Sequence, residues 1–156
     1  MTGETDLREL LTTMRPRRNP GRYVFTVVDG DIPPGVRPVV TVAEDEGLTL
    51  VVPQRDADAA GLKYEYVAGW ITLGVHSALD AVGLTAAVAR ELAAAGLSCN
   101  VVAGFHHDHL FVPYQHAARA VRVLEDLSRR SARARRREGE PPPGPEVVGG
   151  ADRVHR

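Results

Sequence analysis

Residues 64–75 read Tyr64-Glu65-Tyr66-Val67-Ala68-Gly69-Trp70-Ile71-Thr72-Leu73-Gly74-Val75, and their alternation is typical of a strand. Successive side chains of a strand point to opposite faces. One face would carry Val67, Ile71, Leu73 and Val75, and the other Tyr66, Ala68, Trp70 and Thr72. Because both faces are largely apolar, the pattern predicts a central strand covered on both sides. Helices on one face would leave the Tyr66–Trp70 side bare, so we expect a second sheet, a second subunit or both to cover it.

The chain after this strand reads as loop, helix, two strands and helix. His76 to Val82 is predicted to be a loop, and Leu84, Val88 and Leu92 follow the spacing of a helix that Gly96 ends. We expect strands at Cys99–Ala103 and Leu110–Val112, followed by a helix over Ala117–Leu127. The second half is therefore predicted to be β-α-β-β-α.

The chain before this strand reads as helix, three strands and helix. Apolar residues from Leu7 to Met14 predict a first helix, with Thr5 as its N-cap and with Pro16 and Pro20-Gly21 ending it. Later elements are expected as strands at Tyr23–Val28, Val39–Ala43 and Leu48–Val52, and as a short helix at Asp56–Ala60. Each half is an incomplete ferredoxin-like unit, and strands shared or exchanged between the halves would complete both sheets.

The composition is that of a globular protein. The chain has 156 residues, of which 44% are hydrophobic and 25% charged, and its formal net charge of −1 provides no global attraction for nucleic acid or acidic membranes. Cys99 is the only cysteine, which excludes an intramolecular disulfide and a cysteine-based zinc site. With no apolar run of 18 residues and no signal-peptide pattern, we expect a cytoplasmic location and no membrane partner.

The C-terminal segment changes in character at Arg129. Six arginines crowd into residues 129–137, and Pro141-Pro142-Pro143 follows them. We expect residues 129–156 to form a disordered or frayed tail. The arginines are either the solvated end of the last helix or a contact for nucleic acid; the lack of interleaved aromatic residues favours the solvated helix end.

Several segments together resemble the small paired ACT-domain proteins of bacteria. They are Tyr64–Leu73, Gly83-Leu84-Thr85-Ala86-Ala87-Val88-Ala89, Leu97–Gly104 and His107–Pro113, together with the helix at Leu7–Pro16 and the strand at Tyr23-Val24-Phe25. The resemblance covers about residues 4–128 and implies an α+β, ferredoxin-like βαββαβ fold. It implies two ACT-like units, at residues 1–62 and 63–128, with antiparallel sheets and helices on one face. No last strand for the second unit is evident, unless the tail or the N-terminal half supplies it.

The same resemblance implies a regulatory role. ACT units typically bind amino acids or similar small metabolites, often at an interface between units. We therefore expect a ligand-sensing protein and a homodimer, without cofactor or catalytic residues. A metal-dependent or histidine-based enzyme and a purely structural or interaction protein are the alternatives.

The loop before the long helix is the first candidate site. A helix N-terminus presents free N–H groups that suit a carboxylate, Gly83 allows close approach of the backbone, and Asp80 would hold an ammonium group. The expected ligand-binding residues are His76, Ser77, Asp80, Val82, Gly83, Leu84, Thr85 and Asn100. In the structural alternative, Asp80 or Thr85 only caps the helix and Gly83 only makes a turn.

The run His106-His107-Asp108-His109 is the second candidate site, because imidazole and carboxylate groups bind metals. Alternation along a strand leaves at most His107 and His109 on one face, and a metal site would need a further ligand such as His76 or His116. Zinc sites normally use three or four protein ligands, so a polar hairpin turn is the favoured interpretation and we expect no metal site.

Overall fold

Residues 6–139 are described by the computed structural model. Their elements are α1 (Leu7–Thr13), β1 (Pro16–Val28), β2 (Val40–Glu44), β3 (Gly47–Pro53), α2 (Gln54–Ala59), β4 (Val67–Leu73), α3 (Leu84–Ala94), β5 (Asn100–Ala103), β6 (Asp108–Pro113), the 3₁₀ turn η1 (Tyr114–His116) and α4 (Ala117–Gly139). The predicted order of elements is confirmed. No helix among these residues has the length and apolar character that crossing a bilayer requires.

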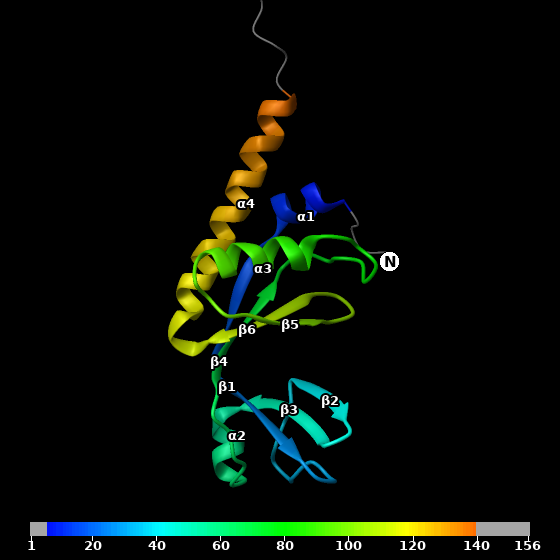
Figure 1. Ribbon diagram of the computed structural model, residues 1–156, viewed down its shortest axis with the longest axis vertical. Helices are drawn as coiled ribbons and strands as arrows, with labels where there is room; N and C mark the ends of the chain where they lie inside the picture. The colour runs from blue at the N-terminus through cyan, green and yellow to red at the C-terminus, as the bar shows by residue number, and fades with distance from the viewer. Residues whose placement is uncertain (1–5, 140–156) are drawn as a thin grey trace, which may run out of the picture.

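The six strands form one antiparallel sheet in the order β2-β3-β1-β4-β6-β5 (Figure 1). Strand β1 pairs with β3 from Tyr23 to Val28, and on its other side it pairs with β4 from Pro16 to Asn19 and again at Tyr23 and Val24. Strands β4-β1-β3-β2 and β1-β4-β6-β5 therefore each show the ferredoxin-like strand order. The N-terminal half supplies the last strand of the second unit, and β4 is in turn the last strand of the first unit.

The extent of β1 differs from the prediction. It begins at Pro16 rather than Tyr23, so Pro20-Gly21 lies inside the strand instead of ending the preceding helix. The ladder with β4 runs from Asn19 opposite Trp70 to Tyr23 opposite Ala68, which leaves a bulge between them. Gly21 occupies this bulge with φ of +97°, a conformation that favours glycine. Proline is tolerated at a bulge and at the first residue of a strand, where its missing N–H breaks no ladder bond.

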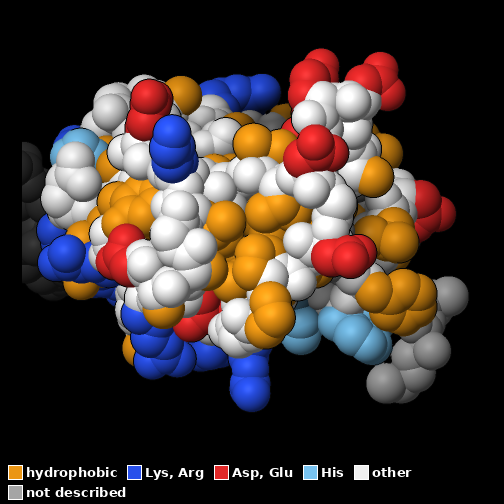
Figure 2. Space-filling model, turned by 90° about the horizontal axis from the view of Figure 1, so that it is seen from below, with side chains coloured by type: hydrophobic (Ala, Val, Ile, Leu, Met, Phe, Trp, Pro, Cys, Tyr) orange, Lys and Arg blue, Asp and Glu red, His pale blue; other side chains and the backbone are white. Residues whose placement is uncertain are grey.

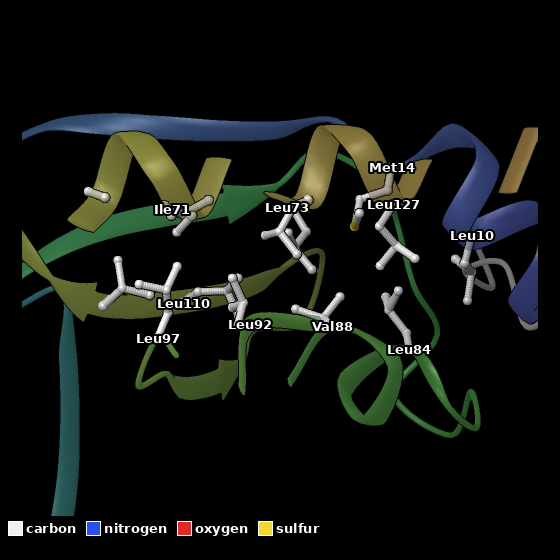
Figure 3. Packing of buried hydrophobic residues seen from close by; sticks show 14 residues of the cluster. Leu10, Met14, Ile71, Leu73, Leu84, Val88, Leu92, Leu97, Leu110 and Leu127 are labelled. Atoms are coloured by element: carbon white, nitrogen blue, oxygen red, sulfur yellow. The ribbon is translucent and has the colours of Figure 1, made fainter. Parts of the chain in front are cut away.

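The helices lie on one face of the sheet. Figure 3 shows the larger core, in which α1, α3 and α4 pack against β4 and β6 through residues that include Leu10, Val88, Leu127, Ile71 and Leu110. Truncating one such leucine to alanine typically costs about 2–5 kcal/mol. The short helix α2 covers a smaller cluster on β1 and β3. The first unit has turns and irregular chain at residues 29–39, where a full ACT-like unit would have its first helix.

The helix-free face carries five of the eight aromatic side chains of the chain: Tyr23, Phe25, Tyr66, Trp70 and Phe111. Figure 1 shows β2 and β3 below β5 and β6. The Phe25 ring on β1 and the Phe111 ring on β6 have centroids only 5.6 Å apart although β4 lies between their strands, which indicates that the sheet bends toward this face. Phe111 and Ala68 are 0% exposed without any helix above them. Aromatic side chains of neighbouring strands thus cover part of the Tyr66–Trp70 side.

Helix α4 corrects the predicted tail. The helix continues through the arginine run to Gly139, so the prediction of a disordered or frayed segment from Arg129 is wrong for residues 129–139. Arginine is a good helix former, and Arg135 pairs with Glu9 on α1. The Ser128 hydroxyl donates to the Thr12 carbonyl at 3.1 Å, which ties α4 to the end of α1. Residues 140–156 of the predicted tail lie outside the described residues.

The N-cap of α1 is Asp6, whose carboxylate accepts from the Glu9 N–H at 3.0 Å. The prediction that Thr5 is the cap is therefore wrong, and Thr5 itself lies outside the described residues. Aspartate and threonine are both good caps, and the sequence pattern alone does not fix the cap to one residue.

Gly69 sets the distance between α4 and the sheet. A Cβ added there would lie 2.6 Å from the Cβ of Ala117, at the first residue of α4. The contact between residues 69 and 117 therefore has room for two glycines, or for one glycine and one alanine. The backbone of β4 therefore approaches the helix as closely as the alanine methyl allows.

Replacing Gly69 by alanine should lower the free energy of unfolding by about 1–3 kcal/mol, because the new methyl group overpacks this contact. Ala117→Gly alone should cost at most about 1 kcal/mol of helix propensity. Combined, the two changes should cost less than their sum, since removal of the Ala117 methyl group makes room for the one added at position 69. Urea unfolding of the four proteins measures this coupling, and strictly additive costs would contradict the proposed contact.

Candidate ligand-binding loop

The loop that joins β4 to α3, residues 74–83, is anchored at its beginning. The Gly74 N–H donates to the Arg15 carbonyl at 2.7 Å, just before β1. A Cβ at Gly74 would lie 2.7 Å from the same oxygen, so a larger residue would push the two segments apart. The shared pairing of β1 with β4 thus fixes where the loop leaves the sheet.

Gly83 fixes the other end of the loop. It is the N-cap of α3, has φ of +102°, and makes no side-chain capping bond. A Cβ there would come within 2.9 Å of Leu7 Cδ2, so α1 packs directly over the beginning of α3. Because neither Asp80 nor Thr85 caps α3, the structural alternative that they serve as caps is wrong, and within residues 6–139 no side-chain capping bond to the beginning of α3 is found.

The other predicted loop residues differ in access to solvent. Asp80 and Thr85 are exposed, and Val82 is 83% exposed. By contrast, Leu84 is buried in the core, and the buried Ser77 hydroxyl donates to the Ala78 carbonyl at 3.3 Å. Asp80, Thr85 and the helix N-terminus are therefore the groups that remain available to a ligand.

Asn100 does not join this loop. It pairs with Phe111 on β6 and lies near Tyr66, just before the beginning of β4, whereas the loop follows the end of β4. The structure therefore separates Asn100 from the other seven predicted residues. Asn100 belongs to the Leu97–Gly104 segment of the ACT-like pattern. A linear pattern of this kind does not indicate at which end of the neighbouring strand a residue lies.

The histidine run lies at the tip of the β5–β6 hairpin, where the Gly104 N–H donates to the His107 carbonyl at 2.8 Å. The His106 ring approaches His76 of the loop, with ring centroids 5.3 Å apart. Among residues 6–139, no three His, Cys, Asp or Glu side chains are grouped so that they could hold a metal ion. The hairpin therefore contacts the loop through an imidazole pair.

His109 belongs to a polar network on the helix-free face. The Trp70 indole N–H donates to His109 Nδ1 at 3.0 Å, and an indole can only donate. His109 must therefore be neutral with its proton on Nε2. Burial, followed by the charge of His107, lowers the pKa of His109 below its usual value. The neighbouring Thr72 hydroxyl accepts from the Asn19 side-chain amide at 2.9 Å, which links the network to β1.

Comparisons with known proteins identify the architecture. A family model described as ACT domain matches residues 2–69, and a second ACT domain model matches residues 65–126. A Vibrio cholerae protein of unknown function, described as a possible transport protein, is 44% identical with a TM-score of 0.71; the match covers 78% of this chain and 95% of that one. The chain belongs to the ACT-domain family. A search of curated proteins finds no match.

More distant solved structures share the paired ACT fold. The Agrobacterium tumefaciens protein Atu0741 is 20% identical with a TM-score of 0.59, over 74% of this chain and 89% of that one. The ligand-free regulatory subunit of aspartate kinase from Thermus thermophilus is 10% identical with a TM-score of 0.55, over 75% of this chain and 97% of that one. At these identities the likeness shows the fold alone.

The only cysteine of this ACT protein lies near the beginning of β5. Burial raises the pKa of Cys99 to about 11, so its thiol stays protonated at neutral pH. A protonated thiol is neither a good nucleophile nor a good metal ligand. The structure therefore gives Cys99 no catalytic activation.

Contacts that the sequence analysis missed come from α1 and β1. Leu7 packs on Gly83, and Arg15 binds Gly74, although both partners lie more than 50 residues away in the sequence. The glycines themselves were a signal for close approach, but nothing in the local pattern named the segment that approaches.

The lowered pKa of His109 predicts a pH effect on stability. Unfolded His109 gains a proton as the pH falls below about 6.5, whereas the folded protein resists this protonation. The stabilising contribution is thus complete above pH 6.5 and is lost as the pH falls through and below that value. Thermal unfolding of His109→Gln, which keeps an acceptor for Trp70, should show a weaker loss of stability between pH 7 and 5 than the unmodified protein.

His116→Gln is the matched control, because it removes a histidine outside this network. The raised pKa of Asp108 acts with the opposite sign, but both proteins in the comparison retain Asp108. An identical pH profile for His109→Gln and the unmodified protein would show that His109 titrates normally.

Proposed function

We propose that this ACT protein is a regulatory module, not an enzyme, and that it binds an amino acid or a similar small metabolite at the loop before α3. ACT domains are regulatory, and a regulatory subunit of aspartate kinase shares the fold. The observation that carries the proposal is the uncapped beginning of α3 at Gly83, next to the exposed carboxylate of Asp80. These groups match the carboxylate and the ammonium group of an amino acid.

The chemistry of such a site is simple. Free first-turn N–H groups and the partial positive charge of the helix N-terminus attract a carboxylate. Asp80 would attract the ammonium group, and the Thr85 hydroxyl would donate or accept a further hydrogen bond. His76 would line the site together with Val82, Gly83 and the backbone of Ser77 and Leu84. Asn100 is not part of this proposal, because it lies at the other end of β4.

A homodimer would complete such a site. Val82 and Leu79 in the loop are 83% and 66% exposed, and Phe105 on the adjoining hairpin is 73% exposed. Three exposed apolar side chains around a candidate ligand loop suit burial against a second copy. We propose that the ligand binds beside this surface and that its presence changes the association of the copies or of a downstream partner.

Thermal unfolding in the presence of each of the twenty amino acids tests the proposal. A ligand present at 100 times its dissociation constant should stabilise the folded protein by about 2.7 kcal/mol. Asp80→Asn should abolish most of that stabilisation while leaving the unfolding of the free protein unchanged, because Asp80 is exposed. The control is Asp45→Asn, which removes one carboxylate from the exposed turn between β2 and β3.

Two results would contradict the proposal. The first is the absence of stabilisation by any amino acid at millimolar concentration. The second is equal stabilisation of the Asp80 and Asp45 variants by the same amino acid, which would place its site away from the loop.

A further inference from the structure

Four arginines lie in the first half of β1 and just before it: Arg15, Arg17, Arg18 and Arg22. No acidic residue occurs between Glu9 and Asp29, although the whole chain has a formal net charge of only −1. The local charge is therefore strongly positive around the bulge of β1. Figure 2 shows basic side chains grouped along the left and lower edge of the molecule, while most acidic side chains lie on the right.

Two of these arginines have partners in the chain itself. The Arg15 guanidinium donates to the Met14 carbonyl at 3.0 Å, and Arg17 donates to the Asn19 side-chain oxygen at 3.1 Å. Their hydrogen bonds explain both side chains as structural. The remaining pair, Arg18 and Arg22, needs a separate explanation.

Arg18 and Arg22 gather on one aromatic ring. Their guanidinium carbons lie 5.0 and 4.4 Å from the centroid of the Tyr114 ring, and within residues 6–139 neither arginine forms an ion pair. Hydrogen bonding and charge from Arg22, with a smaller effect of Arg18, lower the pKa of Tyr114. An aromatic ring offsets only part of the repulsion between two cations, so this arrangement suits an anion.

Arg22 also lines a hollow at the bulge of β1. The hollow has a volume of about 480 Å³, and its lining includes Arg22, Tyr23, Gln54 and Arg55. The positive charge of Arg55 acts on the Tyr23 hydroxyl, where it opposes the larger effect of burial on the pKa. Asp56 is the acidic neighbour: it accepts from the Arg37 N–H at 3.0 Å and forms an ion pair with Nε of the exposed Arg55 at 3.7 Å, which is too long for a good hydrogen bond.

We propose that Arg22 and Arg55, which line this hollow, form an anion site at the bulge of β1 with Arg18 beside Arg22, and that the site binds the phosphoryl group of a small molecule. Guanidinium groups bind phosphate oxygens in bidentate fashion, and a phosphoryl group carries close to two negative charges at neutral pH. A ligand with one carboxylate group carries a single negative charge and would balance only one of these three arginine cations. The remainder of the ligand would occupy the hollow beside Tyr23 and Gln54. This site is separate from the loop at Asp80, so it stands or falls independently of the amino-acid proposal.

Inorganic phosphate is the probe that tests the site. At ionic strength matched with sodium chloride, phosphate should raise the unfolding temperature, and calorimetric titration should give a measurable Kd. Arg22→Gln should weaken phosphate binding about tenfold or more, since it removes a charge-assisted hydrogen bond. Arg22→Lys keeps the positive charge but loses the planar guanidinium group, so its Kd for phosphate should lie between those of the unmodified protein and Arg22→Gln. The control, Arg90→Gln, removes an exposed arginine of α3 and should leave the Kd unchanged.

Succinate at the same ionic strength separates a phosphoryl site from a carboxylate site. Phosphate should bind more tightly than succinate, and binding of succinate equal to that of phosphate would overturn the proposal. It would also be overturned by the absence of any phosphate effect beyond that of chloride, or by the same Kd in Arg22→Gln and Arg90→Gln. Should Arg22→Gln fail to fold, Arg18→Gln and Arg55→Gln provide the same comparison, because both side chains are exposed.

Discussion

The antiparallel pairing of β1 with β4 carries the structure, because each of these strands is the first strand of one ACT unit and the last strand of the other. The pairing is fixed by more than the backbone ladder. The Asn19 side chain, itself buried, donates to the Thr72 hydroxyl across the two strands at 2.9 Å. A buried polar group that lost its partner would cost about 1–3 kcal/mol, so this bond strongly disfavours a slip in register. Neither unit has a complete sheet without the other.

Both candidate sites follow from this shared pairing. The loop at Asp80 leaves the sheet where β4 ends, and the Arg15–Gly74 hydrogen bond sets that point from the β1 side. The arginine pair at Tyr114 lies at the bulge of β1, which interrupts the ladder with β4 between Asn19 and Tyr23. One junction between the units therefore positions an uncapped helix beginning and a cluster of guanidinium groups. The bent sheet also explains how an aromatic face can be buried without a helix above it.

Local pattern predicted most of the elements, and non-local contacts account for the errors. The alternation of Val67, Ile71 and Leu73 against Ala68 and Trp70 correctly predicted the two faces of β4. The first half of β1 was missed because proline and glycine normally interrupt strands, whereas pairing with β4 tolerates them at a bulge. The extension of α4 was missed because a run of like charges suggests a solvated tail. Glu9 on α1, which pairs with Arg135, lies 126 residues away.

The candidate site could also be predicted from the sequence only where its residues are local to one segment. Seven of the eight residues expected to bind a ligand lie in the loop before α3 or at the beginning of α3, where glycine and an acidic residue give a local signal. Asn100 required knowledge of strand direction, and the arginine pair required knowledge of the turn at Tyr114. The spacing of residues within one segment indicates neither the direction of a neighbouring strand nor the position of this turn.

The sharing of β1 and β4 also orders events during synthesis. Residues 16–19 leave the ribosome early, but the strand segment with which they pair, Trp70–Leu73, emerges more than 50 residues later. The last strand of the second unit is thus made before its first. Until β4 appears, the nascent first half of β1 lacks its partner strand, and the like charges of its arginines would disfavour pairing with an identical chain. The positive charge of β1 would then limit aggregation of the nascent chain and attract an anion in the folded protein.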